Sequence, residues 1–175
     1  MTPDQFAEAW ADDPDHLVTF PLRLLNNFSL SLGDKHFLTV AGLPSAAAPC
    51  LSFGPKYAEA ESFGNILGED FQIGSNGSGD PVILTARGEV FYLNHDADFD
   101  PRYINRDLPT LAESLVRYRA LITETVETSG DDAFLEGKIP VRLREGWVEF
   151  LRDADASALA EGSMWADEIA CWTYV

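Results

Sequence analysis

The sequence predicts an α+β fold, in which a small and mostly antiparallel sheet packs against helices within a single domain, residues 1–175. Two patterns carry this prediction. Short apolar runs alternate with turn-forming residues between residues 71 and 93, which is typical of a β-meander. Apolar residues then recur every three or four positions between residues 108 and 128, as in a long helix with one buried face. A chain of 175 residues can bury one core without a metal or disulfides.

The predicted meander contains three strands. Phe71 and Ile73 lie two residues apart, the period expected of a half-buried strand. Residues 82–85 are β-branched or apolar on both faces, which favours a central strand covered on both sides. Pro81 suits the first position of that strand because it has no N–H group for the ladder. Residues 90–93 follow a tight connection and are expected to return as a hairpin partner.

A glycine-rich turn, residues 74–80, separates the first two of these strands. Its backbone N–H groups could cradle an anion. The turn has no lysine, however, and it lies between strands rather than before a helix, unlike a phosphate-binding loop. The sequence therefore favours a structural turn.

The N-terminal part of the chain predicts two short helices. Thr2-Pro3-Asp4-Gln5 matches a capping box, so a helix is expected through Trp10. A second helix is expected over Gly33–Val40, and Gly42 and Pro44 should stop it. The other expectations are an extended piece at residues 17–20, no assignment for 22–32, a strand at 51–53, and a connection at 54–68 anchored by Tyr57, Phe63 and Ile66.

After the meander we expect a polar excursion over residues 94–107 and then the longest helix, to about Thr128. Asp107 is expected to cap this helix, with Pro109 in its first turn. Arg117 and Arg119 lie off the apolar stripe and are expected on its solvent side. The stripe consists of Leu108, Leu111, Leu115, Tyr118 and Ile122.

Residues 129–175 are expected to form a helical C-terminal extension. A helix is predicted from Pro140 to about Asp153, with one or two further turns over 154–163. Residues 165–175 end in a run, 169–175, that is apolar on both faces, and they are expected to form a terminal strand or a docked tail. The residues expected to face inward on the helix are Leu143, Trp147, Phe150 and Leu151. Trp147 and Trp172 could anchor an interface, but their spacing favours the core.

The net charge of the chain is −17. Residues up to Arg87 carry 11 acids and 4 bases, and the rest carry 18 acids and 8 bases, so the acidity is spread over the whole chain. Such a field repels nucleic acid and anionic membranes and speeds the encounter with a basic partner. Solubility alone is an equally good reason for it.

The two cysteines, Cys50 and Cys171, have no disulfide-framework spacing, which favours reduced thiols in a cytoplasmic protein. The first residues lack the basic start and apolar run of a signal peptide. No apolar run reaches membrane-spanning length. We therefore expect a cytoplasmic chain.

Four ordered motifs resemble the SUKH superfamily of bacterial immunity proteins, in its SUKH-four branch. Residues 37–44 are similar to its "FL…GLP" opening, and residues 73–81 to its "IGsdGsGDp" turn. Residues 88–96 are similar to its "G.V..l.Hd" strand, and residues 104–108 to its "vN.SL" helix entry, with Asp107 where the family usually has serine. The resemblance covers roughly residues 37–118. Its motif residues are Gly42, Pro44, Gly74, Gly77, Gly79, Asp80, Pro81, Gly88 and Asn105.

The resemblance implies a SUKH-like domain without enzymatic activity or cofactors, which neutralises a cognate bacterial toxin by direct binding. The acidic charge of the chain predicts a basic toxin partner. The resemblance implies a polymorphic or contact-dependent toxin, and such toxins are often nucleases or deaminases. No nucleic acid or membrane partner is expected. We predict that the acidic loop of Asp96, Asp98 and Asp100 contacts the toxin, together with the solvent side of the long helix.

Other hypotheses stay open at the level of sequence. A regulatory scaffold of the same fold could bind an endogenous cytoplasmic protein. The spacing of Asp96, Asp98, Asp100 and Asp107 imitates a calcium loop, but Pro101 stands where the loop needs glycine, so a solvated loop and no metal site are expected. A small hydrolase would need a cysteine–histidine dyad or a carboxylate pair, for which the sequence has no motif.

Overall fold

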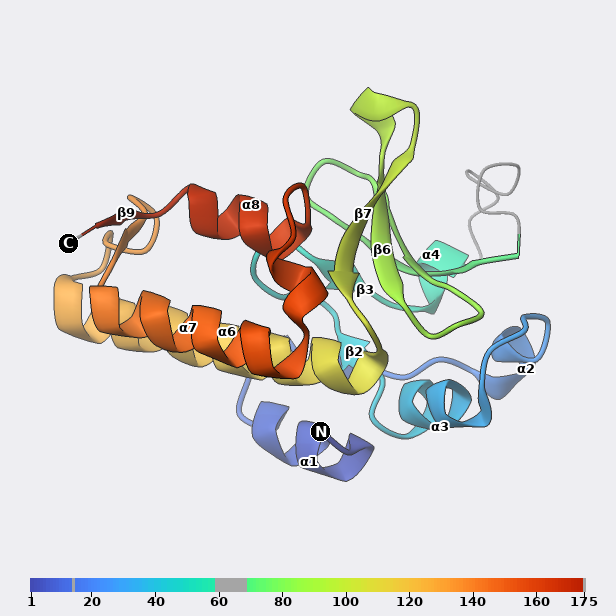
Figure 1. Ribbon diagram of the computed structural model, residues 1–175. Helices are drawn as coiled ribbons and strands as arrows, with labels where there is room; N and C mark the ends of the chain where they lie inside the picture. Colours follow the sequence, from blue (N-terminus) through green and yellow to red (C-terminus); the bar gives the residue numbers. More distant parts are fainter. Residues whose placement is uncertain (14, 59–68, 175) are drawn as a thin grey trace.

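The computed structural model describes residues 1–13, 15–58 and 69–174 and shows an α+β single domain (Figure 1). Its main sheet is antiparallel throughout, with the strand order β3-β4-β5-β6-β7. The predicted fold class is confirmed. The strands are β3 (Ser52–Phe53), β4 (Phe71–Ser75), β5 (Pro81–Leu84), β6 (Val90–Asn94) and β7 (Asp100–Asn105).

The predicted meander forms the centre of this sheet. β5 pairs with β4 on one side and β6 on the other, and all of its residues are buried. A register shift between Gln72 and Gly74 marks a bulge in β4. Apolar residues on both faces of a strand require cover on both faces, and β5 has it.

β7 is a strand that the sequence analysis did not predict, because residues 94–107 were expected to be a polar excursion. The segment instead forms the one-turn η2 (His95–Ala97) and then β7. In the described part of the sheet, β7 lies at the edge and has β6 as its neighbour. An edge strand tolerates Pro101 and exposed charge, so its sequence lacked the apolar alternation that identifies central strands.

Two helices lie side by side along one flank of the molecule, α6 (Leu108–Ser129) and α7 (Val141–Ala154) (Figure 1). The long helix begins as predicted, since the Asp107 carboxylate accepts a hydrogen bond from the Thr110 N–H at 2.8 Å. Ser114 and Thr110 are buried with the apolar stripe, while Ile122 is only partly buried. The predicted helix at 140–153 is likewise confirmed within a residue.

The C-terminal residues correct one prediction. The segment expected as a terminal strand or docked tail begins with α8 (Met164–Ala170), and β9 (Thr173–Tyr174) follows it, parallel to β8 (Lys138–Ile139). Ser163 caps α8, and Trp165 and Ile169 are buried one turn apart. The short η3 (Ala156–Leu159) connects α7 to α8.

In the N-terminal part the Thr2 capping box and α1 (Pro3–Trp10) are confirmed. α3 (Leu32–Val40) begins one residue earlier than predicted, with Ser31 as its cap. Predicted anchors Phe63 and Ile66 lie outside the described residues. The remaining elements are β1 (Leu17–Val18), α2 (Leu22–Leu25), β2 (Leu43–Pro44) and α4 (Pro55–Ala58).

An aromatic cluster joins the two long helices to the C-terminal segment. The Tyr118 ring lies 5.2 Å from Trp147 and 5.1 Å from Trp165, centroid to centroid. Trp172 stacks on the same tyrosine. Trp147 and Trp172 are 3% and 6% exposed, so they are core residues, as the sequence favoured. The Tyr118 hydroxyl donates to Glu168, so its polar end is satisfied within the cluster.

Arg119 corrects the expectation that both arginines of α6 face solvent. Its guanidinium donates to the Asp13 carboxylate at 2.7 Å and to the Ala9 carbonyl at 2.6 Å. It also lies 4.4 Å from the centroid of the Trp10 ring. Arg119 therefore fixes α1 against α6, whereas Arg117 is on the solvent side, as predicted, with 55% of its side chain exposed.

The motif glycines differ in how strictly the fold requires glycine at their positions. Gly42 has a φ of 73°, and a Cβ there would lie 2.2 Å from the Val18 carbonyl oxygen. A Cβ on Gly74 would lie 2.2 Å from the carbonyl oxygen of Ser52 on β3. At Gly79 the φ is 87° but the space is open. Only glycine fits the first two positions without moving backbone.

Candidate functional site

The β6–β7 hairpin projects from the body of the protein (Figure 1), and the three predicted acidic residues lie at and beside its tip. Asp96 is in η2, with 84% of its side chain exposed. Asp98 follows in the left-handed conformation with a φ of 52°. Asp100 begins β7 and is 60% exposed. The three carboxylates are thus close in sequence and accessible, as a contact surface requires.

The base of this tip is held by Asp80, a motif residue that is 3% exposed. Asp80 Oδ1 accepts the His95 backbone N–H at 3.0 Å and contacts His95 Nδ1 at 2.5 Å. Its other oxygen accepts from the Asn76 side chain at 2.8 Å. Asp80 therefore ties the glycine-rich turn to the end of β6.

The two partners shift each other's titration. Burial raises the pKa of Asp80, but the hydrogen bonds from the His95 N–H, the imidazole and Asn76 outweigh it, and the pKa lies below its ordinary value. The hydrogen bond to Asp80 raises the pKa of His95, and the charge of Asp96 adds to it. The pair therefore favours a charged imidazolium against a charged carboxylate.

The tip carboxylates do not converge. Asp96 Oδ1 lies 3.3 Å from His95 Nε2, and Asp100 Oδ2 lies 3.6 Å from Arg102 Nε. Each of the two is directed at a different cationic side chain. Within residues 1–13, 15–58 and 69–174, no three metal-ligating side chains gather in a way that could hold an ion.

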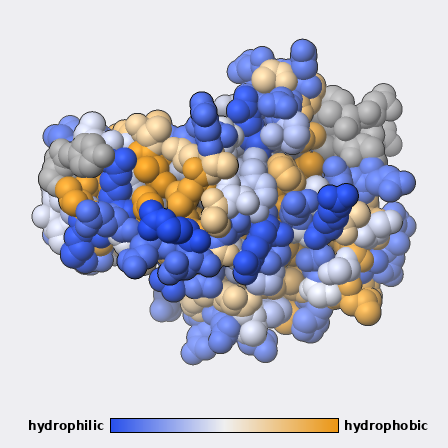
Figure 2. Space-filling view, in the orientation of Figure 1, coloured by the Kyte–Doolittle hydropathy of each residue, from blue (hydrophilic) through white to orange (hydrophobic). Residues whose placement is uncertain are grey.

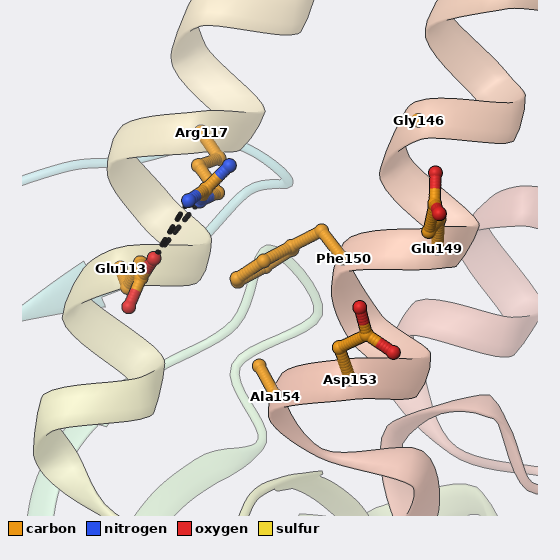
Figure 3. Close-up of a pocket in the computed structure, with 7 residues that line it drawn as sticks. All are labelled: Glu113, Arg117, Gly146, Glu149, Phe150, Asp153 and Ala154. Atoms are coloured by element: carbon orange, nitrogen blue, oxygen red, sulfur yellow. Dashed lines mark hydrogen bonds and ion pairs between the residues drawn. The ribbon is translucent and has the colours of Figure 1, made fainter.

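A second surface feature is an open groove between α6 and α7, which we call the α6–α7 groove. Two adjoining depressions of about 430 and 410 Å³ make it up, and Arg117, Gly146 and Phe150 line both. In Figure 3 the Phe150 ring projects from α7 toward α6. The Arg117 guanidinium covers it at 4.5 Å from the ring centroid. The remaining lining residues are Glu113, Ala120, Leu121, Glu124, Arg142, Leu143, Trp147, Glu149, Asp153 and Ala154.

The charges along this groove divide into paired and unpaired groups. Arg117 donates to Glu113 at 3.0 Å, and Arg142 donates to Glu124 at 2.5 Å, so both cations are neutralised locally. Glu149 and Asp153 are exposed, and their carboxylates have no hydrogen bond or ion pair with a described residue. The groove therefore has an apolar floor and an acidic rim.

The sequence indicated only part of this groove. The solvent side of the long helix was a predicted contact surface, and Arg117 lies on it. Phe150 was expected inward, but it is only partly buried and its ring lines the groove. Gly146, Glu149 and Asp153 were not predicted. Gly146 in the middle of a helix was the available signal, since glycine is unfavourable there.

The two cysteines, which are free, line a third depression of about 420 Å³ with Tyr92, Asp167 and Glu168. None of the described residues that line it is a histidine. The structure therefore does not bring a cysteine–histidine pair together in this depression.

Hydrophilic side chains cover most of the face seen in Figure 2, and hydrophobic ones gather in the region between α7 and α8. In the described part of the chain, no helix is both long and apolar enough to cross a bilayer.

A comparison with family models matches residues 1–171 to the SUKH-4 immunity protein family. The match extends well beyond residues 37–118, in which the sequence motifs lie, and it includes α7 and α8. Searches of curated proteins and of solved structures each returned no significant match. The chain belongs to the SUKH-4 immunity protein family.

Proposed function

We propose that this protein binds one cognate toxin domain in the cytoplasm. It neutralises the toxin by covering the surface with which the toxin binds its own substrate. The observation that carries the proposal is the family match over residues 1–171, since an immunity protein acts on a protein toxin. Binding, rather than turnover of a small molecule, is the mode that the exposed acidic surfaces support.

The net charge of −17 supports a basic toxin. Toxins that cleave or modify nucleic acid need a basic substrate groove, and an acidic protein can occupy such a groove in place of the substrate. Electrostatic complementarity mainly raises the rate of association and excludes wrong partners. The exposed tip carboxylates Asp96, Asp98 and Asp100 are suited to this steering role.

The decisive test is co-expression with the toxin encoded by the neighbouring gene. We expect the protein to restore growth of cells that express the toxin and to co-purify with a catalytically inactive toxin variant at one-to-one stoichiometry. A matched control expresses the same toxin with an unrelated acidic protein of similar size, which should not protect. Failure of both rescue and co-purification would reject the function, and binding to an endogenous protein instead would favour a regulatory scaffold.

A further inference from the structure

We infer that the α6–α7 groove anchors a helix of the toxin that carries an apolar side chain flanked by lysines or arginines. This inference rests on the proposed function and adds the docking site and the chemistry of the docking segment. The groove would hold the complex together, whereas the acidic hairpin tip would steer its formation.

The first observation is that Gly146 opens the groove at the expense of helix stability. It lies in the interior of α7, and a Cβ built there would meet no atom within 4 Å. Its backbone has no left-handed φ that requires glycine. Glycine in a helix interior costs about 1 kcal/mol relative to alanine, and no contact within the described chain explains its presence. A partner side chain that enters the groove does explain it.

The second observation is an unfavourable arrangement of charge on α7. Glu149 and Asp153 are four residues apart, where like charges on a helix repel each other. Asp153 also lies in the last turn, where the helix dipole disfavours a negative charge, although Arg152 beside it has the favourable sign. Departures from local preference are expected at functional sites. A positively charged side chain of the partner would reduce both the repulsion between the two carboxylates and the unfavourable interaction with the helix dipole.

The third observation is the composition of the groove. Phe150 contributes a half-buried aromatic ring, one face of which Arg117 covers, and Leu121, Leu143 and Ala154 extend the apolar lining. Because Arg117 and Arg142 are already paired, the free charge of the rim is that of Glu149 and Asp153. A third helix can place its apolar side chains in the groove between two adjacent helices. Basic residues that flank those apolar side chains would then lie next to Glu149 and Asp153.

The test measures association and dissociation rates between the full-length protein and the inactivated toxin domain of the neighbouring gene. Gly146→Trp fills the groove and is expected to weaken binding by at least about 100-fold, chiefly through faster dissociation. Gly146→Ala adds one methyl group in the space that the partner side chain would take, so it should weaken binding by a smaller factor, about three- to tenfold, while the free protein becomes more stable.

The charge of the rim is tested by Glu149→Gln combined with Asp153→Asn. This double variant is expected to weaken binding by about tenfold or more, mainly through the dissociation rate. Glu8→Gln with Glu127→Gln removes the same charge from exposed positions outside the groove and should change only the association rate, and slightly. Circular dichroism and thermal unfolding confirm that each variant is folded.

The possible results separate the two proposals. If the wild type binds the toxin and Gly146→Trp binds equally well, the groove proposal is overturned while the immunity function stands. If the wild type neither binds nor protects, the function fails and the groove proposal fails with it. If sedimentation shows a dimer of the free protein that Gly146→Trp abolishes, the groove serves self-association and the inference is wrong.

Discussion

The Asp155 carboxylate accepts the Tyr103 hydroxyl on both of its oxygens, at 3.0 and 3.1 Å, and so joins the edge strand β7 to the end of α7. Asp155 Oδ2 also accepts the Arg106 backbone N–H at 2.8 Å, and the Asn105 side chain lies 3.4 Å away. Asn105 in turn accepts from the Trp165 indole at 3.2 Å. This one buried acid therefore joins segments that lie about fifty residues apart in the sequence.

Removing Asp155 should therefore destabilise the whole fold. Asp155 is 6% exposed, and Asp155→Ala would leave the Tyr103 hydroxyl and the Arg106 N–H without an acceptor. An unsatisfied donor costs about 1–3 kcal/mol when it is buried, and these two are part-buried, so a loss of about 2–4 kcal/mol in the free energy of unfolding is expected. Urea denaturation measures it. Tyr103→Phe removes one donor and leaves the acid paired, so it should lose about 1 kcal/mol; equal losses would contradict the network.

The Asp80–His95 pair predicts a pH dependence of stability. Because the pKa of His95 is raised on folding, its contribution is fully present below about pH 6.5 and is lost as the pH rises through the raised value. Because the pKa of Asp80 is lowered, its contribution is present above about pH 3.9 and is lost as the pH falls through the lowered value. Asp96 faces the other ring nitrogen and acts in the same direction as Asp80.

Urea unfolding of the wild type and of His95→Gln at several pH values measures this contribution. The stability difference between the two proteins should be largest near pH 5 and should shrink by pH 9. His16 and His36 are present in both proteins, so their titration cancels in the difference. A difference that grows with pH would show that His95 is neutral in the folded state.

Gly146→Ala should stabilise the protein. The added methyl group meets no atom within 4 Å, so only the helix preference changes, by up to about 1 kcal/mol. Thermal and urea unfolding should both report the gain. A loss of stability would mean that glycine is needed at this position for folding, and the functional reading of Gly146 would lose its basis.

Alanine substitutions at three motif glycines should rank by the space around them. Gly74→Ala is expected to cost about 1–3 kcal/mol, because its Cβ would overlap the Ser52 carbonyl of the neighbouring strand. Gly42→Ala should cost more, since it combines a similar overlap with a φ of 73°. Gly79→Ala has open space and should cost only the left-handed conformation, about 1 kcal/mol. The urea midpoint should therefore fall most for Gly42→Ala, less for Gly74→Ala and least for Gly79→Ala.

Toxin association should slow as salt is added. At 0.15 M ionic strength charges are screened beyond about 8 Å, so an association steered by the long-range field loses rate between 0.05 and 0.5 M salt. Replacing Asp96, Asp98 and Asp100 together by Asn should lower the association rate at low salt and reduce its salt dependence, with little change in dissociation. Association that is indifferent to salt would remove electrostatic steering from the proposed function.

The sequence alone determined the elements whose signals are local. Thr2 and Asp107 were predicted as helix caps because a side-chain oxygen three residues before a backbone N–H can bond to it directly. The three-strand meander followed from its alternation and its turns, and the family was visible in motifs that keep their order along the chain. Neither conclusion needs contacts between distant residues.

The tertiary structure decided whatever depends on distant neighbours. β7 forms because β6 offers it an edge, although its own residues are polar. α8 was missed because the apolar run over residues 169–175 favoured a terminal strand or docked tail, whereas Trp165 and Ile169 are buried one turn apart on a helix and Trp165 packs against Tyr118. Arg119 pairs with a residue more than a hundred positions away, and the α6–α7 groove exists only where two helices meet. A pattern within one segment specifies that segment, whereas a surface made of two segments is specified by their packing.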